Sequence, residues 1–144
     1  MIGLIQRVSE ASVSIDGSVV GEVNRGILLL LGVQKGDDQE KADRLLDKLL
    51  RYRIFPDPEG RMNLSLADIE GELLVVSQFT LAADTRKGTR PGFSSAATPA
   101  DARELYEYFC EQAAARIATA TGEFGADMKV ALVNDGPVTF WLEV

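Results

Sequence analysis

Three short segments hold the residues whose types and spacing could support chemistry. Residues 77–81 read Ser-Gln-Phe-Thr-Leu and place hydroxyl and amide groups directly after an apolar run. Residues 85–92 place three cations in a glycine-containing loop without an acidic residue, and residues 134–139 read Asn-Asp-Gly-Pro-Val-Thr. Polar groups after a strand could position a substrate, clustered cations could bind an anion such as phosphate, and a Gly-Pro unit could present its main chain to a ligand.

The residue types that are missing narrow the chemistry further. The chain has no histidine, which excludes Ser-His and Cys-His catalysis, HExxH zinc sites and any imidazole acid or base. Its one cysteine, Cys110, cannot build a thiolate metal site and is expected to pack rather than react. We therefore expect no metal and no cofactor. An enzyme of this composition would use hydroxyls, carboxylates, amides, main-chain dipoles, Lys or Arg, or groups of its own substrate.

The residues of each segment could also have a purely structural role. Hydroxyls at a strand end could satisfy nearby main chain, clustered cations could form a solvated loop, and Gly-Pro could be a stiff turn. Thr80 or Thr139 could act as a nucleophile only beside a base, which here would be a lysine or a carboxylate. From the residues alone, an enzyme, a non-catalytic RNA-binding module and a structural dimer are all open.

Length, charge and hydropathy indicate one small protein. The 144 residues predict a single domain over 1–144, and a formal charge of −7 argues against wide contact with nucleic-acid phosphates, so we expect no DNA partner. No apolar run approaches the roughly 18 residues that cross a membrane, and the first residues lack the pattern of a signal peptide. With one cysteine and no internal disulfide, we expect a cytoplasmic protein without a membrane partner.

The strands that must position these segments follow from alternation and from apolar runs. Residues 11–23 are typical of a hairpin with Asp-Gly as a two-residue turn of the primed type. Residues 26–33 and 73–81 predict two buried strands, the second turning polar at its serine. Residues 127–133 and 138–144 predict two final strands, joined as a hairpin across Asn-Asp-Gly-Pro.

Two helices follow from the 3.6-residue period and from capping residues. Residues 36–55 predict an amphipathic helix with Asp37 as its N-cap. Its apolar face is predicted to comprise Ala42, Leu45, Leu46, Leu49 and Leu50. Residues 98–122 predict a second helix, capped by Thr98, with proline at the first helical position, and ended by Gly122.

Residues 55–72 and 82–97 are rich in Pro, Gly and polar residues and predict loops. The elements together predict an α/β fold: a single domain with mixed, largely antiparallel β-sheets, hairpin-rich and layered, covered by two main helices. Sites are usually built on loops that follow strand ends, which is where the Ser-Gln-Phe-Thr segment is expected.

The sequence also resembles a known family along its whole length. The segments that carry the resemblance are 1–17, 31–38, 52–65, 73–94 and 133–144. The two most specific motifs are Ser-Gln-Phe-Thr-Leu and Asn-x-Gly-Pro-x-Thr, and together they make the chain similar to the D-aminoacyl-tRNA deacylases. The chain departs from neither motif. Relatives that edit L-alanine carry a different motif, which this sequence does not match.

The resemblance implies a D-aminoacyl-tRNA deacylase-like fold and a homodimer that acts on the aminoacyl end of tRNA. It would hydrolyse the ester that joins a D-amino acid to the terminal adenosine. Gly136 and Pro137 would be held cis and inserted into the active site of the partner subunit, with Arg7, Asn134 and Thr139 in support. The pocket for the adenosine and the ester would be lined by Ser77, Gln78, Phe79 and Thr80.

The resemblance also gives a mechanism to test. Carbonyl oxygens of Gly136 and Pro137 would accept hydrogen bonds from the substrate's α-ammonium, so that an L-side chain would clash with the protein. Glycyl-tRNA would be a side substrate, since glycine has no side chain. Main-chain N–H groups around Phe79 and Thr80 would stabilise the oxyanion, and the ribose 2′-hydroxyl or Thr80 would activate water. The candidate contacts to tRNA phosphates are Arg86, Lys87 and Arg90.

Overall fold

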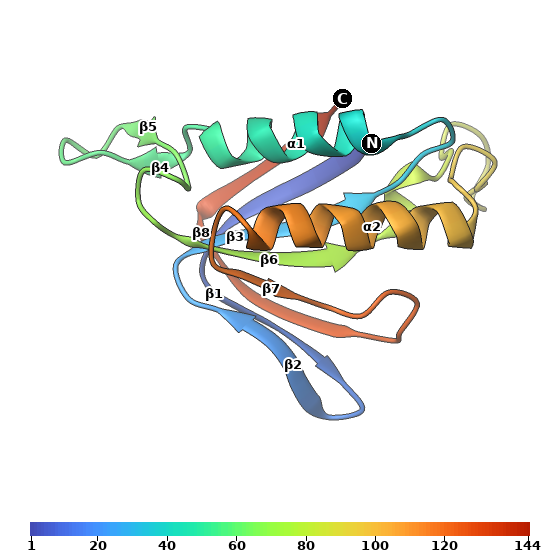
Figure 1. The fold of residues 1–144 in the computed structure, drawn as a ribbon, viewed down its shortest axis with the longest axis horizontal. Coiled ribbons are helices and arrows are strands. Elements are labelled where there is room, and N and C mark those ends of the chain that lie inside the picture. Colours follow the sequence, from blue (N-terminus) through green and yellow to red (C-terminus); the bar gives the residue numbers. More distant parts are fainter.

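Eight strands, two α-helices and one 3₁₀ helix make up the fold in the computed structural model, which describes residues 1–144. In chain order they are β1 (Ile2–Ile15), β2 (Ser18–Val23), β3 (Gly26–Gly32), α1 (Gln39–Arg51), β4 (Phe55–Pro56), β5 (Met62–Leu64), β6 (Glu72–Ser77), η1 (Phe79–Ala82), α2 (Pro99–Ala114), β7 (Thr119–Thr121) and β8 (Lys129–Glu143). Figure 1 shows both helices on the same side of the sheet and the two chain ends close together near α1.

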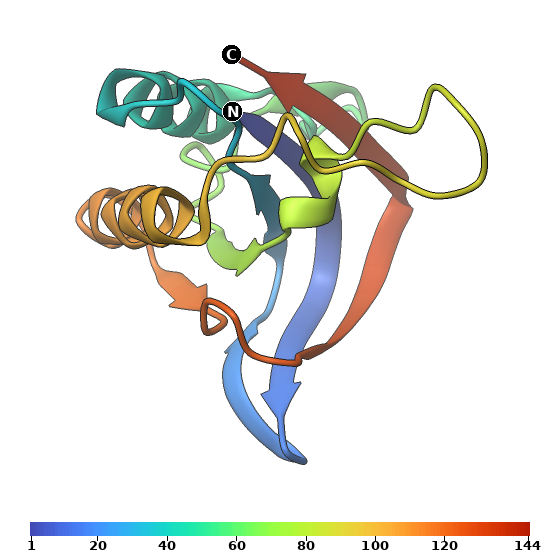
Figure 2. The same cartoon turned by 90° about the vertical axis from the view of Figure 1, so that its right-hand side faces the viewer.

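Six strands form one curved, mixed sheet around the long strand β1. β1 pairs antiparallel with β3 and β2 along one edge and with β8 along the other, whereas β3, β6 and β7 run parallel. The sheet curls until β2 approaches β7, so that a Cβ on Gly21 would lie 2.7 Å from the Thr121 carbonyl oxygen. Figure 2 shows the nearly barrel-like shape that results. The predicted α/β fold with two covering helices is confirmed.

Strands β3 and β6 are buried on both faces, as their apolar runs predict. Ile27 and Leu29 of β3 belong to a cluster of 23 buried residues, which also contains residues of both α-helices. Leu28 points to the opposite face of the sheet and belongs to a cluster of 7 buried residues. A one-residue slip would exchange the two sets of side chains, so the two clusters fix the register of these strands.

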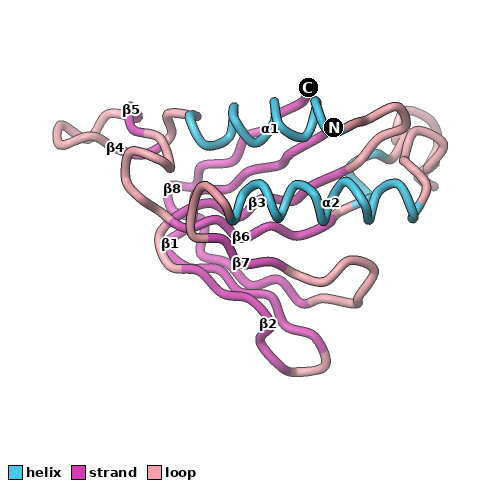
Figure 3. The backbone as a smooth tube through the Cα atoms, in the orientation of Figure 1, coloured by secondary structure: helices cyan, strands magenta, loops and turns pink.

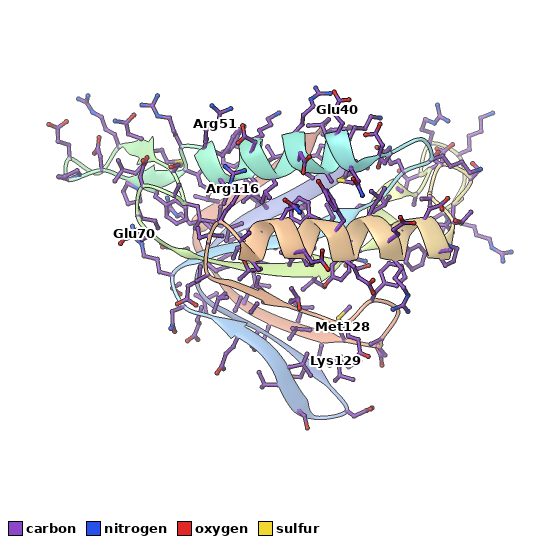
Figure 4. The ribbon with its side chains drawn as sticks, in the orientation of Figure 1. Glu40, Arg51, Glu70, Arg116, Met128 and Lys129 are labelled. Carbon is purple, nitrogen blue, oxygen red and sulfur yellow. The ribbon has the colours of Figure 1, made fainter.

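The first hairpin and the buried face of α1 also form as predicted. Asp16 and Gly17 have φ values of 49° and 80°, positive at both central residues as a primed turn requires. α1 and α2 lie side by side in Figure 3. Arg51 of α1 and Arg116, which follows α2, are labelled in Figure 4 and both bind Asp47, at 3.0 and 3.1 Å. The five apolar residues predicted for the inner face of α1 are all buried.

The N-cap of α1 is Asp38, so the prediction of Asp37 is wrong by one residue. The Asp38 carboxylate accepts the Lys41 N–H at 2.9 Å. The Asp37 carboxylate turns inward and accepts the Gln34 N–H at 2.7 Å and the amino group of Met1 at 2.8 Å. The side chain of Asp37 is only 1% exposed. The local pattern could not reveal this role, because Met1 is remote in sequence.

α2 ends at Ala114, so the prediction that it continues to Gly122 is wrong. Its start is as predicted, with Thr98 accepting the N–H of the third residue after it. Residues Thr119–Thr121 form β7, which pairs in parallel with β6. β-branched residues favour a strand over a helix, and the open edge of β6 supplies the hydrogen-bonding partner.

The last two predicted strands are one strand, so the predicted terminal hairpin is wrong. β8 runs antiparallel to β1, from Lys129 opposite Ser14 to Glu143 opposite Ile2. The Asn-Asp-Gly-Pro segment is a bulge within this strand, where the register with β1 shifts. Both halves of β8 keep the same neighbour because β1, with 14 residues, is long enough to pair with each of them.

Two further segments differ in detail from the sequence prediction. The strand predicted to reach residue 81 ends at Ser77, and η1 follows it. The predicted loop 55–72 contains the short antiparallel pair of β4 and β5. Residues 83–97 lie outside the helices and named strands, as predicted, whereas Ala82, the first residue of the predicted loop 82–97, is the last residue of η1. None of the helices combines the length and the apolar character that crossing a membrane requires.

Candidate active site

The Ser-Gln-Phe-Thr segment stands where the chain leaves the sheet. Ser77, the last residue of β6, pairs with Leu31 of β3, and the Gln78 N–H donates to the Leu31 carbonyl at 2.8 Å. The chain then turns into η1, where Phe79 and Thr80 are exposed. The first N–H groups of a helix have no acceptor within it, so the main chain here can offer donors to a ligand.

Side chains of this segment contact one another and one aromatic neighbour. The Gln78 amide donates to the Thr80 hydroxyl. Phe79 is 56% exposed, and its ring packs against the Phe93 ring, with 5.2 Å between the ring centroids. Sequence reasoning missed Phe93, because no local pattern in a loop shows which ring a side chain will meet. The site offers amides, hydroxyls, ring faces and main chain, none of which titrates near neutral pH.

The bulge of β8 places the Gly-Pro unit at an exposed tip. Gly136 and Pro137 are exposed, and the peptide bond between them is cis, as the resemblance implies. The Asn134 side chain closes the base of the bulge. Its oxygen accepts the Val138 N–H at 2.9 Å, and its nitrogen donates to the Thr139 hydroxyl at 2.9 Å. The main chain on either side of the tip is therefore fixed by one amide.

Arg7 holds the bulge from the neighbouring strand. Its side chain is 12% exposed, and its guanidinium donates to the Asp135 carbonyl at 2.9 Å and to the Ile54 carbonyl at 2.7 Å. Gly136 has a φ of +138°, and a Cβ there would lie 2.6 Å from the Val138 side chain and 3.2 Å from the Arg7 guanidinium. Only glycine fits this position without displacing its neighbours.

The two motifs do not meet within one chain. Ser77 aligns with Leu31 and, through it, with Gly3 of β1, whereas Asn134 aligns with Val8. Thr139, at the other end of the Asn-x-Gly-Pro-x-Thr motif, aligns with Gln6. Val8 and Gln6 lie five and three residues beyond Gly3 on β1, so the two ends of the motif lie roughly 17 and 10 Å along the strand from the position at which Ser77 aligns. A site that used both segments would need a second copy of the chain.

Of the three cations in the third segment, residues 85–92, one forms an ion pair within the chain and two do not. The Arg86 guanidinium donates to the Asp84 carboxylate at 2.9 and 2.7 Å. This contact holds the pKa of Asp84 well below its usual range and raises the pKa of Arg86. Lys87 and Arg90 form no ion pair within the chain.

Two other groups with shifted pKa values belong to the core rather than to the site. The Tyr106 hydroxyl lies 3.1 Å from the Val75 carbonyl oxygen and 3.2 Å from that of Gly122, and burial raises its pKa. Burial also raises the pKa of Cys110 to about 11, and this side chain packs against the larger apolar cluster. No group of three or more His, Cys, Asp or Glu side chains is placed to hold a metal ion.

The fold and the site together define a small α/β protein that would act on its substrate through main chain, amides, hydroxyls and arginine. Comparison with known proteins gives the particular family. Residues 4–143 match the family described as D-Tyr-tRNA(Tyr) deacylase. The chain belongs to this family, and its class is therefore that of a deacylase, a hydrolase of ester bonds.

Relatives of known name are similar to the chain from end to end. The D-aminoacyl-tRNA deacylase of Glaesserella parasuis serovar 5 (strain SH0165) is 64% identical over 144 residues, which cover 100% of both chains. The D-aminoacyl-tRNA deacylase of Haemophilus ducreyi (strain 35000HP / ATCC 700724) is 61% identical, again over 100% of both.

Two solved structures have a similar fold. A structure named c-Myc DNA Unwinding Element Binding Protein superposes with a TM-score of 0.96 at 38% identity, covering 100% of this chain and 99% of the other. A probable eukaryotic D-amino acid tRNA deacylase superposes with a TM-score of 0.84 at 17% identity, covering 99% and 98%. At that lower identity the second structure supports the fold alone.

Proposed function

We propose that this chain hydrolyses the ester of D-aminoacyl-tRNA, releasing the D-amino acid and free tRNA, and that it rejects L-aminoacyl-tRNA through Gly136 and Pro137. Deacylation of D-aminoacyl-tRNA follows from membership of the family over the full length of the relatives. The observation that carries the rest is the tip of the β8 bulge. It is exposed and fixed at its base, yet lies apart from the Ser-Gln-Phe-Thr segment of its own chain.

The proposed homodimer completes each site with a tip from the other chain. The Gly136 and Pro137 carbonyls accept hydrogen bonds from the α-ammonium of the substrate and fix the α-carbon. A D-side chain then points to solvent, whereas an L-side chain meets the wall of the pocket. A steric clash rejects a ligand more strongly than a missing contact does. Glycyl-tRNA has no side chain to clash and is hydrolysed as well.

Hydrolysis in this proposal relies on positioning and on the substrate. Main-chain N–H groups at Phe79 and Thr80 stabilise the oxyanion, Ser77 and Gln78 line the pocket, and the ribose 2′-hydroxyl orients the attacking water. The contacts of the two threonine hydroxyls support this choice over a covalent threonine. Thr80 accepts from the Gln78 amide, and Thr139 accepts from the amides of Asn134 and Gln6. An amide cannot take the proton that a nucleophilic hydroxyl must lose.

We also propose that residues 1–144 form a single deacylase domain and that the protein is cytoplasmic, where its one cysteine stays reduced. The name of one similar structure refers to DNA binding by that protein. We propose no DNA partner for this chain, because a formal charge of −7 opposes broad contact with duplex phosphates.

A paired deacylation assay tests the proposal. D-tyrosyl-tRNA and L-tyrosyl-tRNA are incubated separately with the protein, and release of free tyrosine is followed. We expect rapid release from the D-form, none above background from the L-form, and release of glycine from glycyl-tRNA. An unchanged half-life of the D-ester would contradict the activity, and equal rates for D- and L-forms would contradict the chirality mechanism.

A second assay separates the two candidate groups for water activation. D-tyrosyl-tRNA ending in 2′-deoxyadenosine should resist hydrolysis if the 2′-hydroxyl takes part. Thr80→Ala should then reduce turnover of the normal substrate only in part. Complete loss with Thr80→Ala and normal turnover of the deoxy substrate would instead favour the covalent or general-base role of Thr80.

A further inference from the structure

The loop that carries the cations has a fixed base. The Asp84 N–H donates to the Gly92 carbonyl at 2.7 Å, and the Gly92 N–H donates to the Asp84 carbonyl at 3.0 Å. These two bonds close the loop, and residues 85–91 extend from them away from the body of the molecule, as Figure 2 shows in olive. The cations therefore lie on a projecting loop whose base is closed by two main-chain hydrogen bonds.

The cations line a hollow without apolar residues. Its volume is about 490 Å³, and its walls comprise Asp84, Arg86, Lys87, Arg90, Gly92 and Ser94. Because the Asp84 carboxylate neutralises Arg86, the charges left for a ligand are those of Lys87 and Arg90. In a chain with a formal charge of −7, two neighbouring unpaired cations form a local site for an anion.

The base of the loop that carries this hollow is connected to the candidate active site. Asp84 follows η1 by two residues, and Phe93 comes directly after the closing residue of the loop. The Phe93 ring packs on Phe79. The base of the loop is therefore connected to the Ser-Gln-Phe-Thr segment both along the chain and by a side-chain contact. An RNA end whose last nucleotide lay at that segment would have its preceding phosphates within reach of the loop.

We propose that Lys87 and Arg90 bind the backbone phosphates of the single-stranded end of tRNA, next to the aminoacylated nucleotide. This inference rests on the proposed function. Single-stranded nucleic acids are held by cations that follow the backbone and by aromatic rings beside them, which is the combination that this loop and its base provide. The Asp84–Arg86 pair shapes the hollow and contributes no free charge.

Kinetics on two substrates test the inference. The Lys87→Gln/Arg90→Gln variant is compared with wild type on D-tyrosyl-tRNA and on the D-tyrosyl ester of adenosine, which has no phosphate. For the tRNA we expect KM at low salt to rise roughly tenfold with kcat unchanged. The slope of log KM against log salt should fall by about 1.4, since each contact to a single strand contributes about 0.7. For the adenosine ester we expect no change.

The matched control is Arg44→Gln/Lys48→Gln, which removes the same charge from two exposed residues of α1 that form no ion pair. It should leave both substrates unaffected. An unchanged KM and salt slope for the loop variant would overturn the inference, as would an equal loss on both substrates. If wild type hydrolysed neither substrate, the proposed function itself would fall, and the inference with it.

Discussion

Single side chains fix the part of the molecule that is proposed to meet the substrate. Arg7 and Asn134 come from different strands, yet both bond to the main chain of the β8 bulge. Because Arg7 also donates to the Ile54 carbonyl, it ties the bulge to the connection that follows α1. A charged donor with two carbonyl partners holds a main-chain segment more firmly than neutral contacts do.

Arg7→Lys should weaken deacylation without unfolding the protein. An ammonium is a point donor that does not reproduce the guanidinium fork, so one of the two carbonyl contacts is lost. Hydrogen bonds to charged groups contribute about 1.5–3 kcal/mol. We therefore expect kcat/KM for D-aminoacyl-tRNA to fall roughly tenfold to a hundredfold, measured together with the thermal melting temperature.

Arg53→Lys is the matched control, because Arg53 also donates through Nε to a carbonyl, that of Asn63 at 2.9 Å, away from the bulge. It should leave kcat/KM unchanged. Equal activity of the Arg7 and Arg53 variants would argue against a role of Arg7 in positioning the Gly-Pro tip.

At the scale of elements, the start of α1 shows two neighbouring aspartates with different roles. Asp38 caps the helix at the surface, whereas Asp37 is buried and bonds to main chain and to the amino group of Met1. Lys41 contributes a further contact to Asp37 at 3.4 Å. A buried carboxylate in such a network cannot be removed without leaving charge and N–H groups unpaired.

Asp37→Ala should therefore destabilise the protein more than Asp38→Ala. Removing one partner of a buried ion pair costs about 3–5 kcal/mol, and loss of an N-cap costs about 1 kcal/mol. Urea unfolding monitored by circular dichroism would measure both free energies. Equal losses for the two variants would show that the buried network contributes little.

The second helix carries a thiol that should be inert. With its pKa raised to about 11 by burial, Cys110 stays neutral at pH 8, where an unfolded cysteine is partly ionised. Alkylation by iodoacetamide at pH 8 should be roughly a hundredfold slower in the native protein than in urea. Labelling at equal rates would contradict the packed environment of the thiol.

The same shift gives a pH dependence of stability. Folding favours the neutral thiol, so the contribution of Cys110 is complete below the unfolded pKa of about 8.5 and is lost as the pH rises through about 11. The free energy of unfolding of the wild type should thus fall more steeply over this range than that of Cys110→Ala.

At the scale of the whole molecule, the fold presents its two candidate functional segments at different places along β1. Along β1, the position at which Ser77 aligns and the two ends of the bulge are separated by roughly 10–17 Å. Trp141, on the same strand as the bulge, is 51% exposed. Large exposed rings of this kind are enriched at protein interfaces, which supports the proposed homodimer.

Mixing two impaired variants should raise activity above that of either variant alone if each site uses both chains. Gly136→Ala disrupts the tip, and Gln78→Ala/Thr80→Ala disrupts the pocket. In a refolded equimolar mixture half of the dimers are mixed, and each mixed dimer has one intact site of two. The mixed dimers should therefore contribute about a quarter of wild-type activity.

Each variant refolded alone is the control and should show only its own residual activity. Absence of recovery, with mixed dimers demonstrated by mass spectrometry, would show that the tip does not act in the neighbouring subunit.

Much of the local structure could be predicted from the sequence. The errors share one cause, which is strand pairing between residues far apart in the chain. Thr98 and the primed turn at Asp16 were predicted correctly, because a cap or a turn depends on residues within a few positions. The extent of α2 and the terminal hairpin were predicted wrongly. β6 takes residues 119–121 as a partner strand, and β1 keeps both halves of β8 on one edge.

For the candidate site, too, the sequence predicted the local features and missed the contacts between residues that are distant in the chain. The motifs gave the residues and, through the resemblance, the family. They could not show that Arg7 reaches Ile54 or that Phe93 packs on Phe79. Nor could they show that Asp84 neutralises Arg86 and leaves two other cations unpaired.

The sequence by itself determined the family, the buried strands, the first hairpin and the absence of imidazole chemistry. These depend on residue types and on spacing within a few positions. Only the tertiary structure decided that Asn-Asp-Gly-Pro is a bulge and not a turn, and that it lies apart from the Ser-Gln-Phe-Thr segment. The reason is that strand pairing joins residues more than a hundred positions apart, and the free energy of that pairing overrides the preference of a four-residue segment.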